Sequence, residues 1–223
     1  MEKRYDIVEI KENVLADNDR VAGKIREELR RSNTCFINLM ASPGAGKTSL
    51  LIKTIEALKD KYSIGVMEAD ADGDVDAKTI SALGVRTLQI HTGGLCHMDA
   101  DMTFRGLKEL GFEDLDLIFL ENVGNLVCPA EFDVGAALQF MILSVPEGDD
   151  KPLKYPLMFK VSDCMIVNKI DAEAVFDFDY EACVERARAL NPEIRPFRLS
   201  ALKGENVDEW IRYLDGFIRE WRK

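Results

Sequence analysis

The chain has 223 residues, of which 47% are hydrophobic and 31% charged, and its formal net charge is −11 at pH 7. Such a chain suits a single globular α/β domain, and an acidic balance without a Lys/Arg-rich block excludes a typical nucleic-acid binder. No apolar run approaches the roughly 20 residues that cross a bilayer, and residues 1–13 lack a signal-peptide core, so we expect a cytoplasmic protein with reduced cysteines.

Hydrophobic periodicity alternates between helix and strand along the chain. Residues 17–31 place Val21, Ile25 and Leu29 four apart, which predicts an amphipathic helix. Further helices are predicted at 48–60, 98–110, 179–190 and 205–220. Strands are predicted at 34–40, 62–69, 85–90, 115–121, 139–145, 162–168 and 193–199. This alternation predicts a doubly wound, mostly parallel α/β sheet flanked by helices, with function in the loops at the carboxyl ends of the strands.

The segment 41–49, ASPGAGKTS, follows the first strong strand and precedes a helix. It matches the phosphate-binding P-loop except that Ala41 replaces the first glycine, which is acceptable if φ is negative there. Lys47 is placed for the β- and γ-phosphates and for catalysis, and Thr48 for Mg²⁺. The alternative, a glycine-rich turn with an incidental lysine, does not explain the strand–loop–helix context. The nucleotide contacts predicted here are Gly44, Ala45, Gly46, Lys47, Thr48 and Ser49.

A guanine-binding loop is predicted after the strand at 162–168. There, Asn168, Lys169 and Asp171 form the NKxD arrangement of GTPases. The Asp171 carboxylate can accept from guanine N1–H and the exocyclic amine, whereas adenine would leave it unpaired at a cost of about 1–3 kcal/mol. On its own, NKxD also fits a loop of solvated charges, but here it follows a P-loop. The last base-contacting loop is predicted at Ser200, Ala201 and Leu202.

Two acidic segments are candidates to respond to the γ-phosphate. Residues 68–76, EADADGDVD, read either as a solvated loop or as a source of the water-positioning group, for which we select Asp72 before Asp70 or Asp76. In the second segment, Glu121 takes the Mg²⁺ side and Gly124 offers its N–H to the γ-phosphate. The predicted Mg²⁺ ligands are Thr48, Asp70 and Glu121.

A second metal site is predicted from Cys96, His97 and Cys128, because thiolate and imidazole suit Ni²⁺ and Zn²⁺. The alternative is two buried apolar cysteines and a histidine that starts a helix. Three ligands fall short of a closed zinc site, and neighbouring side chains point to different sides unless the loop bends sharply. Both considerations favour a metal shared across a two-fold interface. The remaining cysteines are expected in the core: Cys35, Cys164 and Cys183.

Together these motifs resemble the HypB family, hydrogenase nickel-incorporation GTPases of the SIMIBI class. The most specific stretch is Glu121–Gly135, supported by SPGAGKTS, Cys96-His97 and NKID. Urease-maturation GTPases are similar but carry Cys-Pro-His, whereas Ala130 follows Cys128-Pro129 here. Residues 1–34 contain neither the cysteine motif nor the histidine-rich stretch of some members, so the Cys96 site is left to carry metal transfer.

The resemblance implies a low-turnover GTPase that acts as a nickel metallochaperone in [NiFe]-hydrogenase maturation. It also implies GTP/GDP, Mg²⁺ and Ni²⁺ or Zn²⁺ as cofactors, a GTP-favoured homodimer, and as partners a nickel-binding accessory protein and the hydrogenase large subunit. Residues 1–33 are predicted to form a helical extension and 34–223 the GTPase domain. The competing hypotheses are a related urease-type nickel GTPase, a P-loop small-molecule kinase, and a zinc-stapled dimer with an idle nucleotide site.

Overall fold

The computed structural model describes residues 10–70, 73 and 75–223. Over these residues, seven strands form one parallel sheet in the order β3-β2-β4-β1-β5-β6-β7. The predicted doubly wound α/β fold is confirmed, and all the strand pairs described are parallel. The strands are β1 (Cys35–Ala41), β2 (Ile64–Asp70), β3 (Arg86–His91), β4 (Leu117–Glu121), β5 (Leu138–Ser144), β6 (Cys164–Asn168) and β7 (Arg195–Arg198).

The central strand β1 is buried along its whole length, as expected for a parallel strand covered on both faces. Ile37 and Leu39 face one hydrophobic cluster, whereas Phe36 and Met40 face clusters on the other side. This alternation follows from the two-residue period of a strand. The apolar run that predicted the strand therefore belongs to two cores at once.

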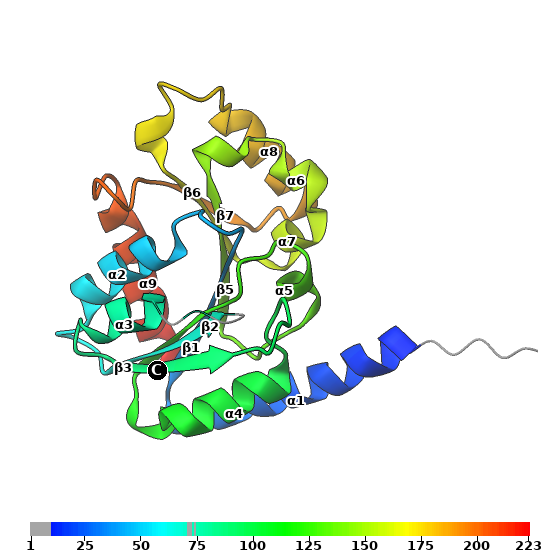
Figure 1. Ribbon diagram of the computed structural model, residues 1–223, viewed down its shortest axis with the longest axis vertical. Coiled ribbons are helices and arrows are strands. Elements are labelled where there is room, and N and C mark those ends of the chain that lie inside the picture. Colours follow the sequence, from blue (N-terminus) through cyan, green and yellow to red (C-terminus); the bar gives the residue numbers. More distant parts are fainter. Residues whose placement is uncertain (1–9, 71–72, 74) are drawn as a thin grey trace, which may run out of the picture.

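Helices cover both faces of the sheet (Figure 1). One face packs against α2 (Lys47–Leu58), α3 (Val75–Ser81) and α9 (Val207–Trp221). The other face packs against α1 (Ile10–Ser32), α4 (Ala100–Leu110), α5 (Cys128–Glu131), α7 (Pro156–Val161) and α8 (Tyr180–Leu190). The short α6 (Lys151–Lys154) lies against α7 and α8.

The first helix is longer than predicted and lies beside α4 (Figure 1). Ile25 and Leu29 are buried in the same cluster as Phe36 of β1. Arg26 donates to the Ala136 carbonyl at 3.3 Å and contacts the Asp133 carboxylate at 2.7 Å. The division of the chain at residue 33 remains a prediction, but the buried face of α1 belongs to the core of the sheet.

The sequence did not predict the short helices α3, α5, α6 and α7. Each has only four to seven residues, too few to repeat a 3.6-residue pattern. Three of them carry a proline in their first turn, where the missing N–H costs no hydrogen bond. Among the residues described, no helix combines the length and apolar character that a membrane crossing needs.

The packing of α1 leads to a stability prediction. Ile25→Ala removes a fully buried side chain and should lower the free energy of unfolding by about 2–5 kcal/mol. Val14→Ala, on the same helix at a half-exposed position, should change it by less than about 0.5 kcal/mol. Urea denaturation followed by circular dichroism measures both. Equal effects of the two substitutions would contradict the burial of α1 in the core.

Candidate functional site

The P-loop joins the end of β1 to the start of α2. Lys47 is the first residue of α2, and Thr48 and Ser49 complete its first turn. Gly44 and Gly46 have positive φ angles of 75° and 99°, whereas Ala41, the last residue of β1, is not in that region. The substitution of alanine for the first glycine is therefore compatible with the loop. The backbone N–H groups at the start of α2 supply the anion-binding end of a helix.

The predicted guanine loop packs directly against the P-loop. Asn168 donates its Nδ2 hydrogen to the Ala45 carbonyl at 2.9 Å, and Lys169 Nζ donates to the Gly44 carbonyl at 2.6 Å. Asn168 Oδ1 in turn accepts from the Ala201 N–H at 3.0 Å. One buried amide thus connects the phosphate loop, the NKxD loop and the loop that begins at residue 200.

Asp171 is oriented by that last loop. Ser200 Oγ donates to Asp171 Oδ1 at 2.6 Å, and the Lys203 N–H donates to Ser200 Oγ at 3.2 Å. Leu202, the outermost residue of the loop, is 77% exposed. The residues predicted to bind the base therefore meet at one end of the P-loop.

The predicted magnesium side lies at the other end of the P-loop. Thr48 Oγ1 donates to Glu121 Oε1 at 2.8 Å, and Glu121 is 2% exposed. Its Oε2 atom is buried and has no hydrogen-bond partner among the residues described. One oxygen each from Glu121, Glu68 and Asp76 lies within 4.8 Å of the other two. This set of hard oxygen donors, with one oxygen left unpaired, fits Mg²⁺.

Burial changes the protonation of this carboxylate pair. Glu68 and Glu121 are opposite each other on β2 and β4, and burial raises the pKa of each to about 7. The nearby Lys47 ammonium opposes this rise in both pKa values. When bound, Mg²⁺ would be held by Thr48 and these carboxylates and would neutralise charge on the nucleotide phosphates.

The predicted residues of the acidic loop lie around the same position. Asp70 ends β2, and its Oδ1 accepts from the Gly73 N–H at 2.7 Å. A cavity of about 190 Å³ is lined by Glu68, Asp70, Gly73, Val75 and Asp76. Asp72, selected as the water-positioning group, lies outside the described residues. Its role remains a prediction.

The segment after Glu121 passes close to the P-loop. A Cβ atom placed on Gly124 would lie 3.1 Å from Pro43 Cγ and 3.2 Å from Pro43 Cα. Only a glycine allows the two loops to approach this closely without a shift. Because the two loops are in close contact, a displacement of Pro43 or Gly124 toward the other would force that loop to shift.

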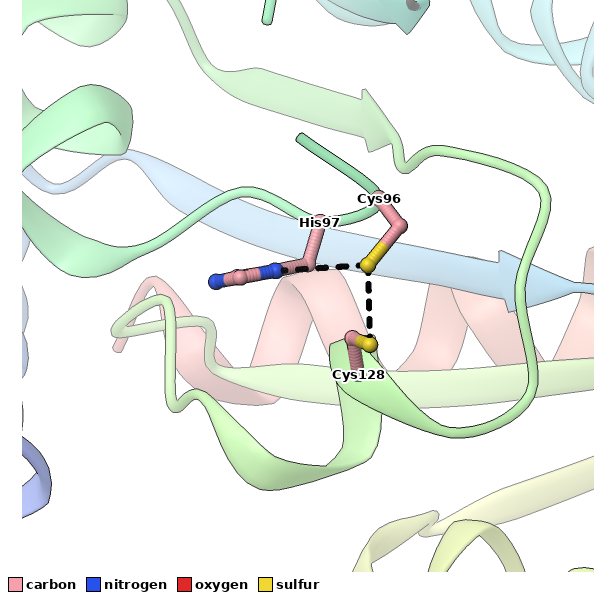
Figure 2. A group of neighbouring side chains, drawn as sticks. All are labelled: Cys96, His97 and Cys128. Carbon is pink, nitrogen blue, oxygen red and sulfur yellow. Dashed lines mark hydrogen bonds between the residues drawn. The ribbon is translucent and has the colours of Figure 1, made fainter. Parts of the chain in front are cut away.

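The three predicted soft ligands meet at the end of this segment (Figure 2). Cys96 Sγ lies 2.9 Å from Cys128 Sγ and 3.9 Å from His97 Nδ1. Cys96 and His97 come from the loop between β3 and α4, and Cys128 starts α5. This donor set fits Ni²⁺ or Zn²⁺ as a bound metal. The other cysteines are buried, as expected: Cys35, Cys164 and Cys183.

The side chains of residues 96 and 97 were expected to point to different sides unless the loop bends sharply, and in the structure they converge. The ligand atoms of both residues lie within 4.8 Å of each other and of Cys128 Sγ. Gly93 and Gly94, earlier in the same loop, have positive φ angles of 65° and 89°, which favour glycine. Convergence within one chain removes that part of the argument for a shared metal. The count of three donors still leaves a metal with open coordination positions.

Local packing orients the histidine ring. His97 stacks on Phe132, with ring centroids 4.0 Å apart and an interplanar angle of 19°. Partial burial lowers the pKa of His97, which favours the neutral, metal-binding imidazole. The pKa of Cys128 is raised, mainly by the hydrogen bond with the Cys96 thiol and secondly by burial. A metal that binds this pair must therefore displace thiol protons.

Comparison with known proteins identifies the family. Residues 35–198 match the family described as CobW/HypB/UreG, nucleotide-binding domain. The chain is 47% identical to the hydrogenase maturation factor HypB of Azotobacter chroococcum over 94% of its own length and 68% of that protein. The chain belongs to the HypB family. Crystallised HypB from Helicobacter pylori, in complex with nickel, aligns with a TM-score of 0.85 and 38% identity over 92% of this chain and 96% of that one.

A more distant protein shares this fold. The signal recognition particle receptor FtsY of Elizabethkingia anophelis aligns with a TM-score of 0.54 and 15% identity, over 100% of this chain and 76% of that one. At this identity the likeness shows the fold alone.

In this HypB-family chain, sequence reasoning gave Glu68 no specific role. The carboxylate lies in β2, is 4% exposed and pairs in register with Glu121. The available signal was a glutamate at the end of an apolar strand, where a charge has to be matched by a partner or a cation. The sequence does not show which strand lies beside β2, so it could not identify Glu121 as the neighbour.

The carboxylate pair predicts a pH-dependent stability of the magnesium- and nucleotide-free protein. Folded Glu121 has a pKa of about 7 against an ordinary value of 4.5, so between these values the folded state binds more protons. Stability therefore falls as pH rises through this window. Glu121→Gln should remove this loss, gaining about 3 kcal/mol at pH 8 relative to its effect at pH 4.

Urea midpoints measured in EDTA from pH 4 to pH 8 test this expectation. Glu56→Gln, at an exposed position on α2, controls for the change of carboxylate to amide and should keep the wild-type pH profile. A Glu121→Gln profile parallel to that of the wild type would contradict a buried proton at this site.

Proposed function

We propose that this chain is a GTP-binding hydrogenase maturation factor that slowly hydrolyses GTP and hands nickel on to a partner. The observation that carries the proposal is the course of residues 121–128. The segment starts at Glu121, beside Thr48, passes Pro43 at Gly124 and ends at Cys128, beside Cys96. One short segment thus touches both the phosphate loop and the metal ligands.

The residues of this chain have separate roles in the proposal. Lys47 and the N–H groups that begin α2 bind the phosphates, and Asp171 selects guanine. Thr48 and Glu121 hold the cation. Residues 121–124 then differ in position between the GTP and GDP states, because loss of the γ-phosphate removes a group that orders them.

A partner interface at the metal ligands is part of the proposal. Leu95 and Val127, which precede Cys96 and Cys128, are each 50% exposed. Exposed apolar side chains beside a metal site with open coordination positions favour a surface that binds another protein. We infer a homodimer in the GTP state, with a nickel-binding accessory protein and the hydrogenase large subunit as the proteins before and after the hand-over in the cytoplasm.

Guanine selection predicts a change of nucleotide specificity. In Asp171→Asn, the side-chain NH2 group and the guanine exocyclic amine are both donors and cannot bond each other. GTP should therefore bind about 10- to 100-fold more weakly. Xanthosine triphosphate, which has a carbonyl at that position, should bind more tightly than it does to the wild type. Competition with a fluorescent guanine nucleotide measures both. Unchanged GTP affinity, or phosphoryl transfer from ATP that survives the substitution, would favour the small-molecule kinase.

Nucleotide control of the metal site is the central prediction. We expect the nickel dissociation constant with GDP to differ at least about fivefold from that with a non-hydrolysable GTP analogue. Cys128→Ala should abolish the tight binding, whereas Cys183→Ala, a buried cysteine away from the site, should retain it. Isothermal titration with nickel measures the constants. Equal constants in the two nucleotide states, together with an unchanged dimer fraction, would contradict the proposed function.

A further inference from the structure

A buried asparagine lies between the nucleotide switch and the metal ligands. Asn122, which follows Glu121 at the end of β4, is fully buried. Its Oδ1 atom accepts from the Met98 N–H at 3.3 Å and from the Val123 N–H at 2.9 Å. Its Nδ2 group donates to Asn38 Oδ1 of β1 at 3.2 Å. The side chain thus links β1, the switch segment and the loop that carries the ligands.

The contact with Met98 determines the position of the ligand loop. Met98 is fully buried and follows His97 directly. Asp99 then caps α4 by accepting from the Met102 N–H at 2.7 Å. The backbone at Met98 is therefore fixed by its bond to Asn122 and by the helix cap at Asp99. His97 precedes this fixed residue directly.

Asn122 can respond to its own segment because one oxygen atom serves two donors. The bond to Met98 is the longer of the two, near the end of the hydrogen-bond range. A shift of Val123 and Gly124 by a few tenths of an ångström changes how Oδ1 divides between the two donors. Because a buried N–H left without an acceptor is costly, the Met98 loop has to follow.

A second bridge runs in the same direction. Asn125 Nδ2 donates to the Cys96 carbonyl at 3.2 Å, and its Oδ1 accepts from the Val127 N–H at 2.9 Å. Two amides of the same segment therefore bond the ligand loop. Asn125 bonds the Cys96 carbonyl, and Asn122 bonds the N–H of Met98, the residue after His97.

A third amide holds the ligand loops without contact to the switch segment. Asn18 of α1 is 8% exposed. It accepts from the Ala100 N–H and donates to the Asp133 carbonyl, both at 2.9 Å. It thus provides a matched case, a buried asparagine bonded to the start of α4 and to the chain after α5.

We propose that Asn122 is the positioning residue through which the nucleotide state reaches the metal ligands, by moving the Met98 N–H and with it His97 and Cys96. The inference rests on the proposed function, since it requires metal affinity to depend on the nucleotide. It adds the side chain that transmits the dependence. Asn18, by contrast, sets the affinity of the site but not its response.

The test compares Asn122→Ala with Asn18→Ala in the full chain. Nickel is titrated into each protein saturated with GDP or with the non-hydrolysable GTP analogue, and the thiolate-to-nickel charge-transfer absorption is recorded. In Asn122→Ala the ratio of the two dissociation constants should fall to within about twofold of one, from at least about fivefold in the wild type. In Asn18→Ala both constants should weaken by the same factor, leaving the ratio unchanged.

Each outcome decides the inference. A wild-type ratio in Asn122→Ala overturns it while the proposed function stands, and so does an equal collapse of the ratio in Asn18→Ala. A ratio of one in the wild type itself refutes the proposed function, and the relay with it. If Asn122→Ala does not fold, Asn122→Ser tests the same link, because its shorter side chain cannot bond both the Met98 N–H and Asn38 Oδ1, and it should at least halve the wild-type ratio. An unchanged ratio in that variant overturns the inference.

Discussion

Parallel pairing of β1, β4 and β2 fixes the depth at which the functional loops begin. Leu39 of β1 is in register with Glu121 of β4, which is in register with Glu68 of β2. β1 continues to Ala41 before the phosphate loop starts. The two carboxylates therefore lie just below the phosphate loop, at a depth set by strand register. A slip of one residue would turn both to the opposite face of the sheet.

This placement leaves the site electrostatically incomplete. Charging two buried carboxyl groups at once has a high free-energy cost. Without a cation to neutralise them, the carboxylates bind protons instead. Glu121 Oε2, beside Thr48, has no hydrogen-bond partner among the residues described, and a bound cation would supply one. The stability of the apo protein and the capacity to bind a metal nucleotide are thus opposing demands on the same residues.

The sequence was most informative where the chemistry is local. The phosphate loop and NKxD each place their side chains within a few residues, after a strand, so their positions could be predicted. The closeness of Glu68 to Glu121 depends on strand order, and that of Cys96 to Cys128 on the packing of two loops that are distant in sequence. Asn122 carries no sequence signal of its own, because a buried asparagine differs from an exposed one only in its neighbours.

The contacts of Asn18 give α1 a mechanical meaning. The helix carries none of the ligands, yet one of its side chains is joined to the start of α4 and to the chain just after Phe132. A displacement of α1 would therefore act at the same time on the start of α4, just after His97, and on the chain after α5, which begins with Cys128. The helix thus links the segments next to Cys96 and Cys128, although it is remote in sequence from both.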